Sequence, residues 1–80
     1  MSSADQILAV IAHVVDSEEV VSNPDLPLYD LSLLDSLKTV ELMVTLSEEF
    51  RVEISPAEFE RQQWATPRKI VAYLERKMAA

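Results

Sequence analysis

The feature that most constrains the fold of this chain is the complete absence of glycine from its 80 residues. Tight β-hairpin turns need backbone conformations with positive φ, which glycine adopts more readily than any other residue. Glycine-rich phosphate loops and dinucleotide-binding fingerprints are excluded for the same reason. The sequence therefore predicts an all-α protein.

The residue content leaves few kinds of catalytic or metal-binding chemistry open. There is no cysteine, which excludes disulfides, thiolate metal sites and a cysteine nucleophile. His13 is the single histidine, and no stretch has the spaced oxygen ligands of an EF-hand loop. Acid pairs such as Glu48 and Glu49 fall on a solvated helix face, away from the desolvated pocket that a general acid needs. We therefore expect no enzymatic activity, no catalytic residue and no metal site.

Length and hydrophobicity predict one domain over residues 1–80. The hydrophobic fraction of 49% is enough for a single core. The longest apolar run, Ile7 to Ala12, is too short to cross a membrane. No basic segment precedes an apolar stretch at the N-terminus, as it would in a signal peptide. We expect a cytoplasmic protein with no direct membrane insertion.

The net charge of −7 is unevenly distributed along the chain. Residues 1–50 carry ten acids and one base, whereas residues 51–80 carry four acids and six bases. Binding to nucleic acid or anionic lipid needs clusters of lysine and arginine, so the acidic part disfavours both. It favours protein partners with basic patches, although acidity that serves only solubility is an equally good interpretation.

Capping and periodicity predict a first helix from about Ala4 to Glu19. Ser3 and Gln6 have capping-box spacing, with Ser3 as the N-cap, and apolar residues recur behind them at helical spacing. The connection that follows, Val20 to Leu34, contains two Xaa-Pro pairs that disfavour a helix. Because it is rich in leucine, we expect it to fold against the helices, with a short turn around Leu28 to Leu31. The inserted side chains would be Leu26, Leu28, Leu31, Leu33 and Leu34.

A second helix is predicted from Asp35 or Ser36, as its N-cap, to about Phe50. Its apolar residues cover roughly 220° of the helical wheel, about twice the stripe that a helix needs to face a core. Part of this apolar surface should therefore be exposed, unless the neighbouring loop covers it. The edge nearest the acidic side would suit a protein partner and consists of Leu37, Val40 and Val44.

The last third of the chain predicts one short and one longer helix. Ser55 as N-cap, Pro56 as first helical residue and Glu58 as the capping-box acid open a short helix to about Arg61. Phe59 and Trp64 bracket the join between this helix and the next one and are interpreted as packing residues. A second cap-plus-proline pair, Thr66-Pro67, opens the last helix, whose buried stripe would be Ile70, Val71, Leu74 and Met78. The expected fold is a four-helix bundle of three longer helices and one short helix, with a long first loop.

Ser36 is the candidate functional residue. A helix start offers free N–H groups and the positive end of the helix dipole, which favour a nearby anion by about 0.3–1 kcal/mol. A phosphodiester on the Ser36 hydroxyl would therefore be held at a suitable site. The alternative is that Asp35 and Ser36 serve only as a helix cap, since both residue types are preferred there.

A family resemblance is carried by the run Asp35-Ser36-Leu37-Lys38-Thr39-Val40-Glu41-Leu42, with Glu48-Glu49-Phe50 after it. This run closely resembles the attachment segment of acyl carrier proteins, and length, acidity, helix order and the long first loop match that family throughout. The resemblance implies an acyl-carrier-type bundle in which Ser36 receives 4′-phosphopantetheine from coenzyme A. The arm's thiol would carry the cargo as a thioester, which accounts for the lack of cysteine. The surface recognised by partners would comprise Asp35, Leu37, Val40, Glu41, Val44 and Glu48.

A second run resembles one branch of that family, the D-alanyl carrier proteins of teichoic-acid D-alanylation. It reads Glu58-Phe59-Glu60-Arg61-Gln62-Gln63-Trp64-Ala65-Thr66-Pro67-Arg68-Lys69-Ile70, and Leu33-Leu34-Asp35-Ser36 resembles the same branch. Two positions differ from the usual pattern, because Ser32 and Lys38 stand where these carriers usually have glycine. From Leu37 to Phe50 the chain is as similar to fatty-acid carriers.

The resemblance implies a carrier that holds D-alanine as a thioester for transfer to a cell-envelope polymer, teichoic acid. The implied partners are a phosphopantetheinyl transferase, an adenylating D-alanine ligase and a membrane-bound acyltransferase, with the carrier itself a monomer. A fatty-acyl or other aminoacyl carrier is the first alternative, and an unmodified helical adaptor is the second. A charged D-alanyl ammonium should stay outside the bundle, whereas a fatty chain would prefer an expandable core. The bulky Phe59 and Trp64 favour a closed core.

Overall fold

The computed structural model describes residues 3–79, apart from the Glu58 side chain. In chain order the elements are α1 (Ser3–Val15), α2 (Glu19–Ser22), α3 (Ser36–Phe50), the 3₁₀-helices η1 (Pro56–Glu58) and η2 (Arg61–Trp64), and α4 (Pro67–Ala79). No β-strand occurs within residues 3–79. The predicted all-α class is confirmed, with three longer helices and one short α-helix.

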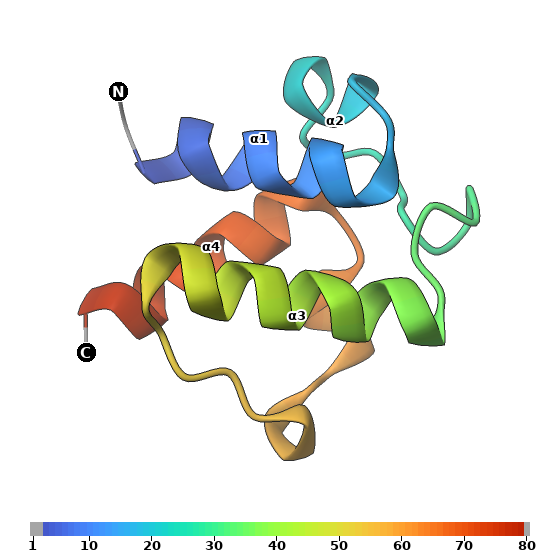
Figure 1. The fold of residues 1–80 in the computed structure, drawn as a ribbon. Helices are drawn as coiled ribbons and strands as arrows, with labels where there is room; N and C mark the ends of the chain where they lie inside the picture. The colour runs from blue at the N-terminus through green and yellow to red at the C-terminus, as the bar shows by residue number, and fades with distance from the viewer. Residues whose placement is uncertain (1–2, 80) are drawn as a thin grey trace.

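The three longer helices pack around one core, with α1 in contact with α2, α3 and α4. Figure 1 shows α3 running back beside α1 in the opposite direction, and α4 following the direction of α3. Apolar residues four apart in each helix lie on one face and so meet at the centre. Six residues of this kind are fully buried: Ile7 and Ile11 of α1, Leu42 and Leu46 of α3, and Ile70 and Leu74 of α4.

The first helix ends earlier than the predicted Glu19, at Val15. Asp16 adopts a left-handed conformation with φ of 56°, and the Ser17 N–H donates to the Ala12 carbonyl at 3.0 Å. This is the geometry of a Schellman helix end, in which glycine is the usual residue. At the other end Ser3 is itself helical, so it is not the predicted N-cap; the position before it lies outside the described residues.

The long first connection begins with the short helix α2, which the sequence did not predict. The predicted turn is present, since the Leu31 N–H donates to the Pro27 carbonyl at 3.0 Å and the Ser32 N–H to the Tyr29 carbonyl at 3.0 Å. Leu26, Leu28 and Leu34 are buried, and Leu33 is half-buried, as predicted. The prediction was wrong for Leu31, whose side chain is 51% exposed at the outside of the turn.

The segment between α3 and α4 forms two 3₁₀-helices where one short helix from Pro56 to Arg61 was predicted. The Ser55 hydroxyl does cap η1, accepting from the Ala57 N–H at 3.3 Å. The predicted capping-box contact of Glu58 lies outside the described side chains. Phe59 and Glu60 interrupt the helix with extended backbone, ψ 130° and 123°, and the side chains of Phe59 and Trp64 pack into or against the core.

The last helix begins at the predicted pair, with the Thr66 hydroxyl accepting from the Lys69 N–H at 3.2 Å. Ile70, Val71 and Leu74 are buried as predicted. Met78 is 39% exposed, so its inclusion in the buried stripe was wrong; it lies beyond the end of the core in the final turn of α4.

Candidate functional site

Ser36 is the first residue of α3, and Asp35 is its N-cap. Asp35 has extended backbone, and its Oδ1 accepts from the Lys38 N–H at 2.8 Å. The side-chain acceptor satisfies one of the N–H groups that a helix start leaves unpaired. Asp35 therefore fixes the helix start, and Ser36 is left exposed beside it.

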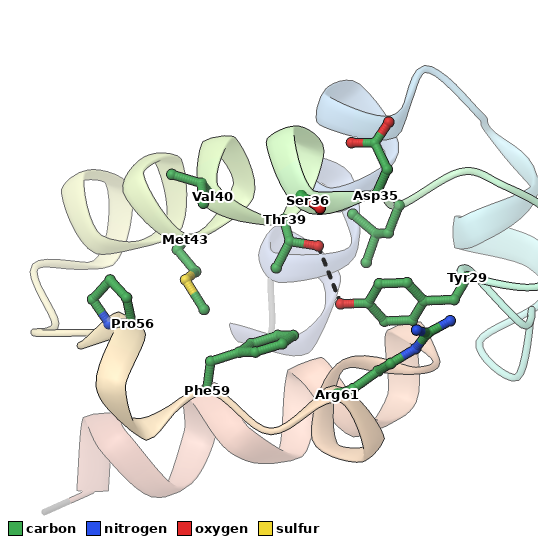
Figure 2. A pocket seen from close by; sticks show the side chains of 10 residues that line it. Tyr29, Asp35, Ser36, Thr39, Val40, Met43, Pro56, Phe59 and Arg61 are labelled. Carbon is green, nitrogen blue, oxygen red and sulfur yellow. Dashed lines mark hydrogen bonds between the residues drawn. The ribbon is translucent and has the colours of Figure 1, made fainter.

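A pocket of about 530 Å³ opens next to Ser36 and is referred to below as the Ser36 pocket. Its walls come from the long first connection, from α3 and from the two 3₁₀-helices, as Figure 2 shows. The lining residues are Tyr29, Leu34, Asp35, Ser36, Thr39, Val40, Met43, Pro56, Phe59 and Arg61. Half of these side chains are apolar, and the polar groups come from Tyr29, Asp35, Ser36, Thr39 and Arg61.

Tyr29 joins the walls of the Ser36 pocket to one another. Its hydroxyl lies 3.1 Å from the Thr39 hydroxyl of α3, with which it forms a hydrogen bond. On the other side, the Arg61 guanidinium lies 4.4 Å from the centre of the Tyr29 ring, within the range of a cation–π contact. The N–H of Leu28, the residue before Tyr29, donates to the carbonyl of Ala65 at 2.9 Å, which fixes the loop against the end of η2. The pocket thus depends on contacts between residues far apart in the sequence.

Phe59 forms the wall of the pocket opposite α3, and further aromatic rings lie behind it. The Phe59 and Trp64 ring centres are 6.1 Å apart, and those of Trp64 and Tyr73 are 5.6 Å apart, both pairs being tilted. Phe59 is half-buried, whereas Trp64 is fully buried. We refer to Phe59, Trp64 and Tyr73 as the aromatic cluster. The prediction that Phe59 and Trp64 are packing residues agrees with this arrangement, although Phe59 also faces the pocket.

The apolar edge of α3 is exposed, as the sequence predicted. Leu37 is 82% exposed, Val40 is 52% exposed and Val44 is 51% exposed, so the neighbouring loop does not cover them. Glu41 and Glu48 are exposed on the same helix. Asp35 is the N-cap of the same helix, so all six residues lie along α3 and its cap, next to the exposed Ser36.

Lys38, which departs from the D-alanyl carrier pattern, links α3 to α1. Its Nζ donates to the Val14 carbonyl at 3.2 Å and lies 3.6 Å from Glu41 Oε2. Carbonyls in the last turn of a helix have no partner within the helix, and a cation is favourable there. Lys38 therefore supports the end of α1 from the first turn of α3.

Sequence reasoning did not identify Tyr29, Thr39 and Arg61 as pocket residues. Thr39 offered a signal, because it is a polar residue one helical turn after Ser36 on a side of α3 that is otherwise apolar. It is 6% exposed, the one buried polar side chain among those described. Tyr29 and Arg61 gave no comparable signal, since only the fold brings these two residues together.

The described residues contain neither a cluster of metal ligands nor a helix suited to cross a membrane. Between residues 3 and 79, no group of three or more histidine, cysteine, aspartate or glutamate side chains could hold a metal ion. Over the same part of the chain, no helix has the length and apolar character needed to cross a membrane.

The residues around Ser36 fit a phosphopantetheine group. The serine hydroxyl is exposed, so an enzyme can reach it, and it lies at the start of a 15-residue helix, where an anionic phosphodiester is favoured. The Ser36 pocket adjoins this hydroxyl and offers both apolar walls and hydrogen-bonding groups.

Comparisons with known proteins agree with this geometry. A protein-family model described as "Phosphopantetheine attachment site" matches residues 5–74. Proteins named D-alanyl carrier protein are similar over almost the whole chain. One from Listeria welshimeri is 36% identical over 75 residues, which cover 94% of this chain and 96% of the relative. One from Staphylococcus saprophyticus is 37% identical with the same coverage, and one from Lacticaseibacillus casei is 44% identical over 69 residues, 86% of this chain and 85% of the relative. The chain therefore belongs to the phosphopantetheine-attachment family of carrier proteins, and the three relatives described above are D-alanyl carrier proteins of that family.

Proposed function

We propose that this protein carries D-alanine as a thioester on 4′-phosphopantetheine attached to Ser36, for transfer to a cell-envelope polymer such as teichoic acid. The observation that carries the proposal is an exposed serine at the first turn of α3, next to a pocket, in a chain whose relatives named D-alanyl carrier protein span 94% of it. The two glycine positions that differ, Ser32 and Lys38, both have structural roles that leave the attachment site intact.

Ser36 would supply the oxygen of the new phosphodiester bond. Its hydroxyl loses a proton and attacks the phosphorus of coenzyme A that bears the pantetheine; the adenosine bisphosphate half of coenzyme A leaves. The helix start then faces the resulting anion, while the Asp35 carboxylate, already bonded to the Lys38 N–H, partly opposes it. The prosthetic group supplies the thiol on which acyl groups are carried, a chemistry that a chain without cysteine cannot provide.

The protein itself would have no catalytic role. Activation and transfer of D-alanine would fall to separate enzymes, namely an adenylating D-alanine ligase and a membrane-bound acyltransferase. A carrier needs only to present its arm to each in turn, so the account requires a single copy of this chain and a cytoplasmic location where ATP and coenzyme A are available. A single carrier domain over residues 1–80 would be sufficient for this task.

The surface that begins at Asp35 and follows α3 would dock the phosphopantetheinyl transferase. Its apolar part, Leu37, Val40 and Val44, is exposed and adjoins the exposed carboxylates of Glu41 and Glu48. A partner complementary to it has an apolar groove with lysine or arginine at its rim, because burying apolar area contributes affinity and charge complementarity orients the encounter. The same surface leads directly to the hydroxyl that the transferase modifies.

The cargo is tested on the phosphopantetheinylated protein by mass spectrometry. Incubation with ATP, D-alanine and a D-alanine ligase should add one D-alanyl group, which hydroxylamine releases because it is bound as a thioester. Parallel reactions replace D-alanine and its ligase with a fatty acid and an acyl-carrier synthetase. Fatty-acyl loading without D-alanyl loading would replace the proposal with the fatty-acyl alternative.

A further inference from the structure

Phe59 lies between the Ser36 pocket, which it lines, and the buried ring of Trp64, which it contacts. Figure 2 shows the Phe59 ring across the pocket from Thr39 and Met43 of α3. Phe59 lines the pocket and at the same time packs against the buried core. An alkyl chain that entered the interior from the attachment point would therefore first meet this ring.

The other two members of the aromatic cluster, Trp64 and Tyr73, fill the space behind the Phe59 ring. Trp64 contacts Phe59 on one side and Tyr73 of α4 on the other, at ring-centre distances of 6.1 and 5.6 Å. Trp64 is fully buried and Tyr73 is 6% exposed, so neither can be displaced outward without opening the core. Protein interiors are close-packed, and forcing extra methylene groups into such a cluster is unfavourable.

The pocket itself suits the arm better than a charged or long cargo. It is open to solvent, so a long alkyl chain lying in it keeps one side in water and gains only part of the benefit of burial. A D-alanyl ammonium would lose its hydration against the apolar walls, and the two charged groups on the lining, the Asp35 carboxylate and the Arg61 guanidinium, have opposite signs and so supply no net attraction. A short acyl group with a charged end is therefore most stable outside the protein.

We propose that Phe59, supported by Trp64, is a specificity-determining residue that closes the core to alkyl chains and so restricts the carrier to short, polar acyl groups. This inference rests on the proposed attachment of phosphopantetheine to Ser36. It assigns to Phe59 a role beyond packing, because the ring separates a pocket at the attachment point from the interior of the bundle.

The test compares three prosthetic groups on each variant of the full chain. A phosphopantetheinyl transferase loads the apo protein from coenzyme A, acetyl-coenzyme A or octanoyl-coenzyme A, and intact mass verifies each product. Thermal melting and the fluorescence of Trp64, the single tryptophan, are then measured. The variants are wild type, Phe59→Ala and Phe50→Ala, the last removing a half-buried phenylalanine that does not line the Ser36 pocket.

In wild type and Phe50→Ala, the octanoyl and acetyl forms should melt within about 1 °C of each other. In Phe59→Ala, the octanoyl form should melt at least about 4 °C above the acetyl form, because the vacated space accepts the chain. Trp64 emission should change on octanoylation in this variant alone. A merely structural role for Phe59 would lower the melting temperatures of all three forms equally and leave this difference at zero.

Phe59→Leu provides a milder opening if the alanine variant is too unstable to melt cooperatively, and the same sign of difference is expected. The inference would be overturned if the octanoyl form of wild type melted as far above its acetyl form as the octanoyl forms of the Phe59 variants do above theirs. It would also be overturned if the octanoyl and acetyl forms had the same melting temperature in both Phe59 variants. If none of the three, coenzyme A, acetyl-coenzyme A or octanoyl-coenzyme A, modified the protein, the proposed function would be overturned, and this inference with it.

Discussion

At the scale of single residues, three positions within residues 3–79 adopt a left-handed backbone conformation that glycine adopts most readily. Asp16, Ser32 and Arg51 have positive φ, between 54° and 60°, in turns that end α1, precede α3 and end α3. The absence of glycine correctly predicted an all-α protein. Because glycine is also the usual sequence signal for such turns, the end of α1 was predicted too late in the chain. A side chain with a Cβ is strained in this conformation by roughly 1–2 kcal/mol. At Ser32, as at the other two positions, glycine would adopt the conformation without this strain.

Arg51→Gly should therefore raise the free energy of unfolding, by up to about 1 kcal/mol. Arg51 ends α3 in the left-handed conformation with φ of 54°, and its side chain is exposed. Relief of the strain exceeds the extra entropy that glycine gives to the unfolded chain. Urea denaturation measures the change. Glu75→Gly, at an exposed position inside α4, is the matched control and should cost about 1 kcal/mol; equal losses in both variants would contradict the strain argument.

Two tyrosine hydroxyls in this protein should respond oppositely to removal. The Tyr73 hydroxyl is buried and, within residues 3–79, has no hydrogen-bond partner, whereas the Tyr29 hydroxyl bonds with Thr39 at 3.1 Å. Tyr73→Phe should leave the free energy of unfolding unchanged or raise it by up to about 1 kcal/mol, because an unpaired buried group is lost. Tyr29→Phe should lower it by about 1 kcal/mol. Denaturant titration of both variants decides, and a clear loss in Tyr73→Phe would show that its hydroxyl has a partner.

At the scale of elements, the start of α3 could be predicted and the pocket beside it could not. Asp35 and Ser36 are adjacent in sequence and follow a local capping rule, so their positions followed from residue types alone. Tyr29 and Arg61 are 32 positions apart and meet only through long-range packing. The irregular segment around Phe59 was missed for the same reason, since burial of the aromatic cluster overrides the local signal for a helix.

The long first connection is held to α4 by a pair whose contribution depends on pH. Arg68 Nε donates to Asp25 Oδ1 at 2.8 Å, and the Arg68 N–H donates to the Pro24 carbonyl at 2.8 Å. The hydrogen bond from Arg68 lowers the pKa of the Asp25 carboxyl below its ordinary value of 3.8. The contribution of a carboxyl with a lowered pKa is present above the ordinary pKa and is lost as the pH falls through the lowered value.

Wild type should therefore be more stable than Asp25→Asn at pH 7, and the difference should shrink once the pH falls below 3.8. The pair is exposed on the surface, so the difference should also shrink at high salt. Thermal melting of both proteins across pH 2 to 7 measures it. A difference that grows toward low pH would contradict this assignment of the ion pair.

At the scale of the whole molecule, the asymmetry of charge agrees with a docking surface on the acidic part of the chain. Residues 1–50 hold ten of the fourteen acids, and the exposed apolar edge of α3 lies among them. Asp35 and the five other recognition residues predicted from the sequence lie in one helix and its cap, next to Ser36. The Ser36 pocket adjoins this proposed docking surface, because Asp35 and Val40 belong to both.

Charge reversal at Glu41 and Glu48 should slow modification without unfolding the protein. Both carboxylates are exposed, and the Glu41 contact with Lys38 spans 3.6 Å at the surface, so little stability depends on them. With Glu41→Lys and Glu48→Lys combined, loading by the transferase should fall about tenfold at low salt. Glu75→Lys makes the same chemical change on α4, away from α3, and should leave the loading rate unaltered. Equal loading rates for wild type, the double variant and Glu75→Lys would contradict the proposed docking surface.

The most direct test of the carrier account is intact-mass analysis after incubation with coenzyme A and a phosphopantetheinyl transferase. Wild type should gain one phosphopantetheine group, located on Ser36 by peptide mapping. Ser36→Ala should gain none, while Ser22→Ala, which removes another exposed serine, should be modified like wild type. An unmodified wild-type protein, or a Ser36→Ala variant that still acquires the arm, would contradict the account.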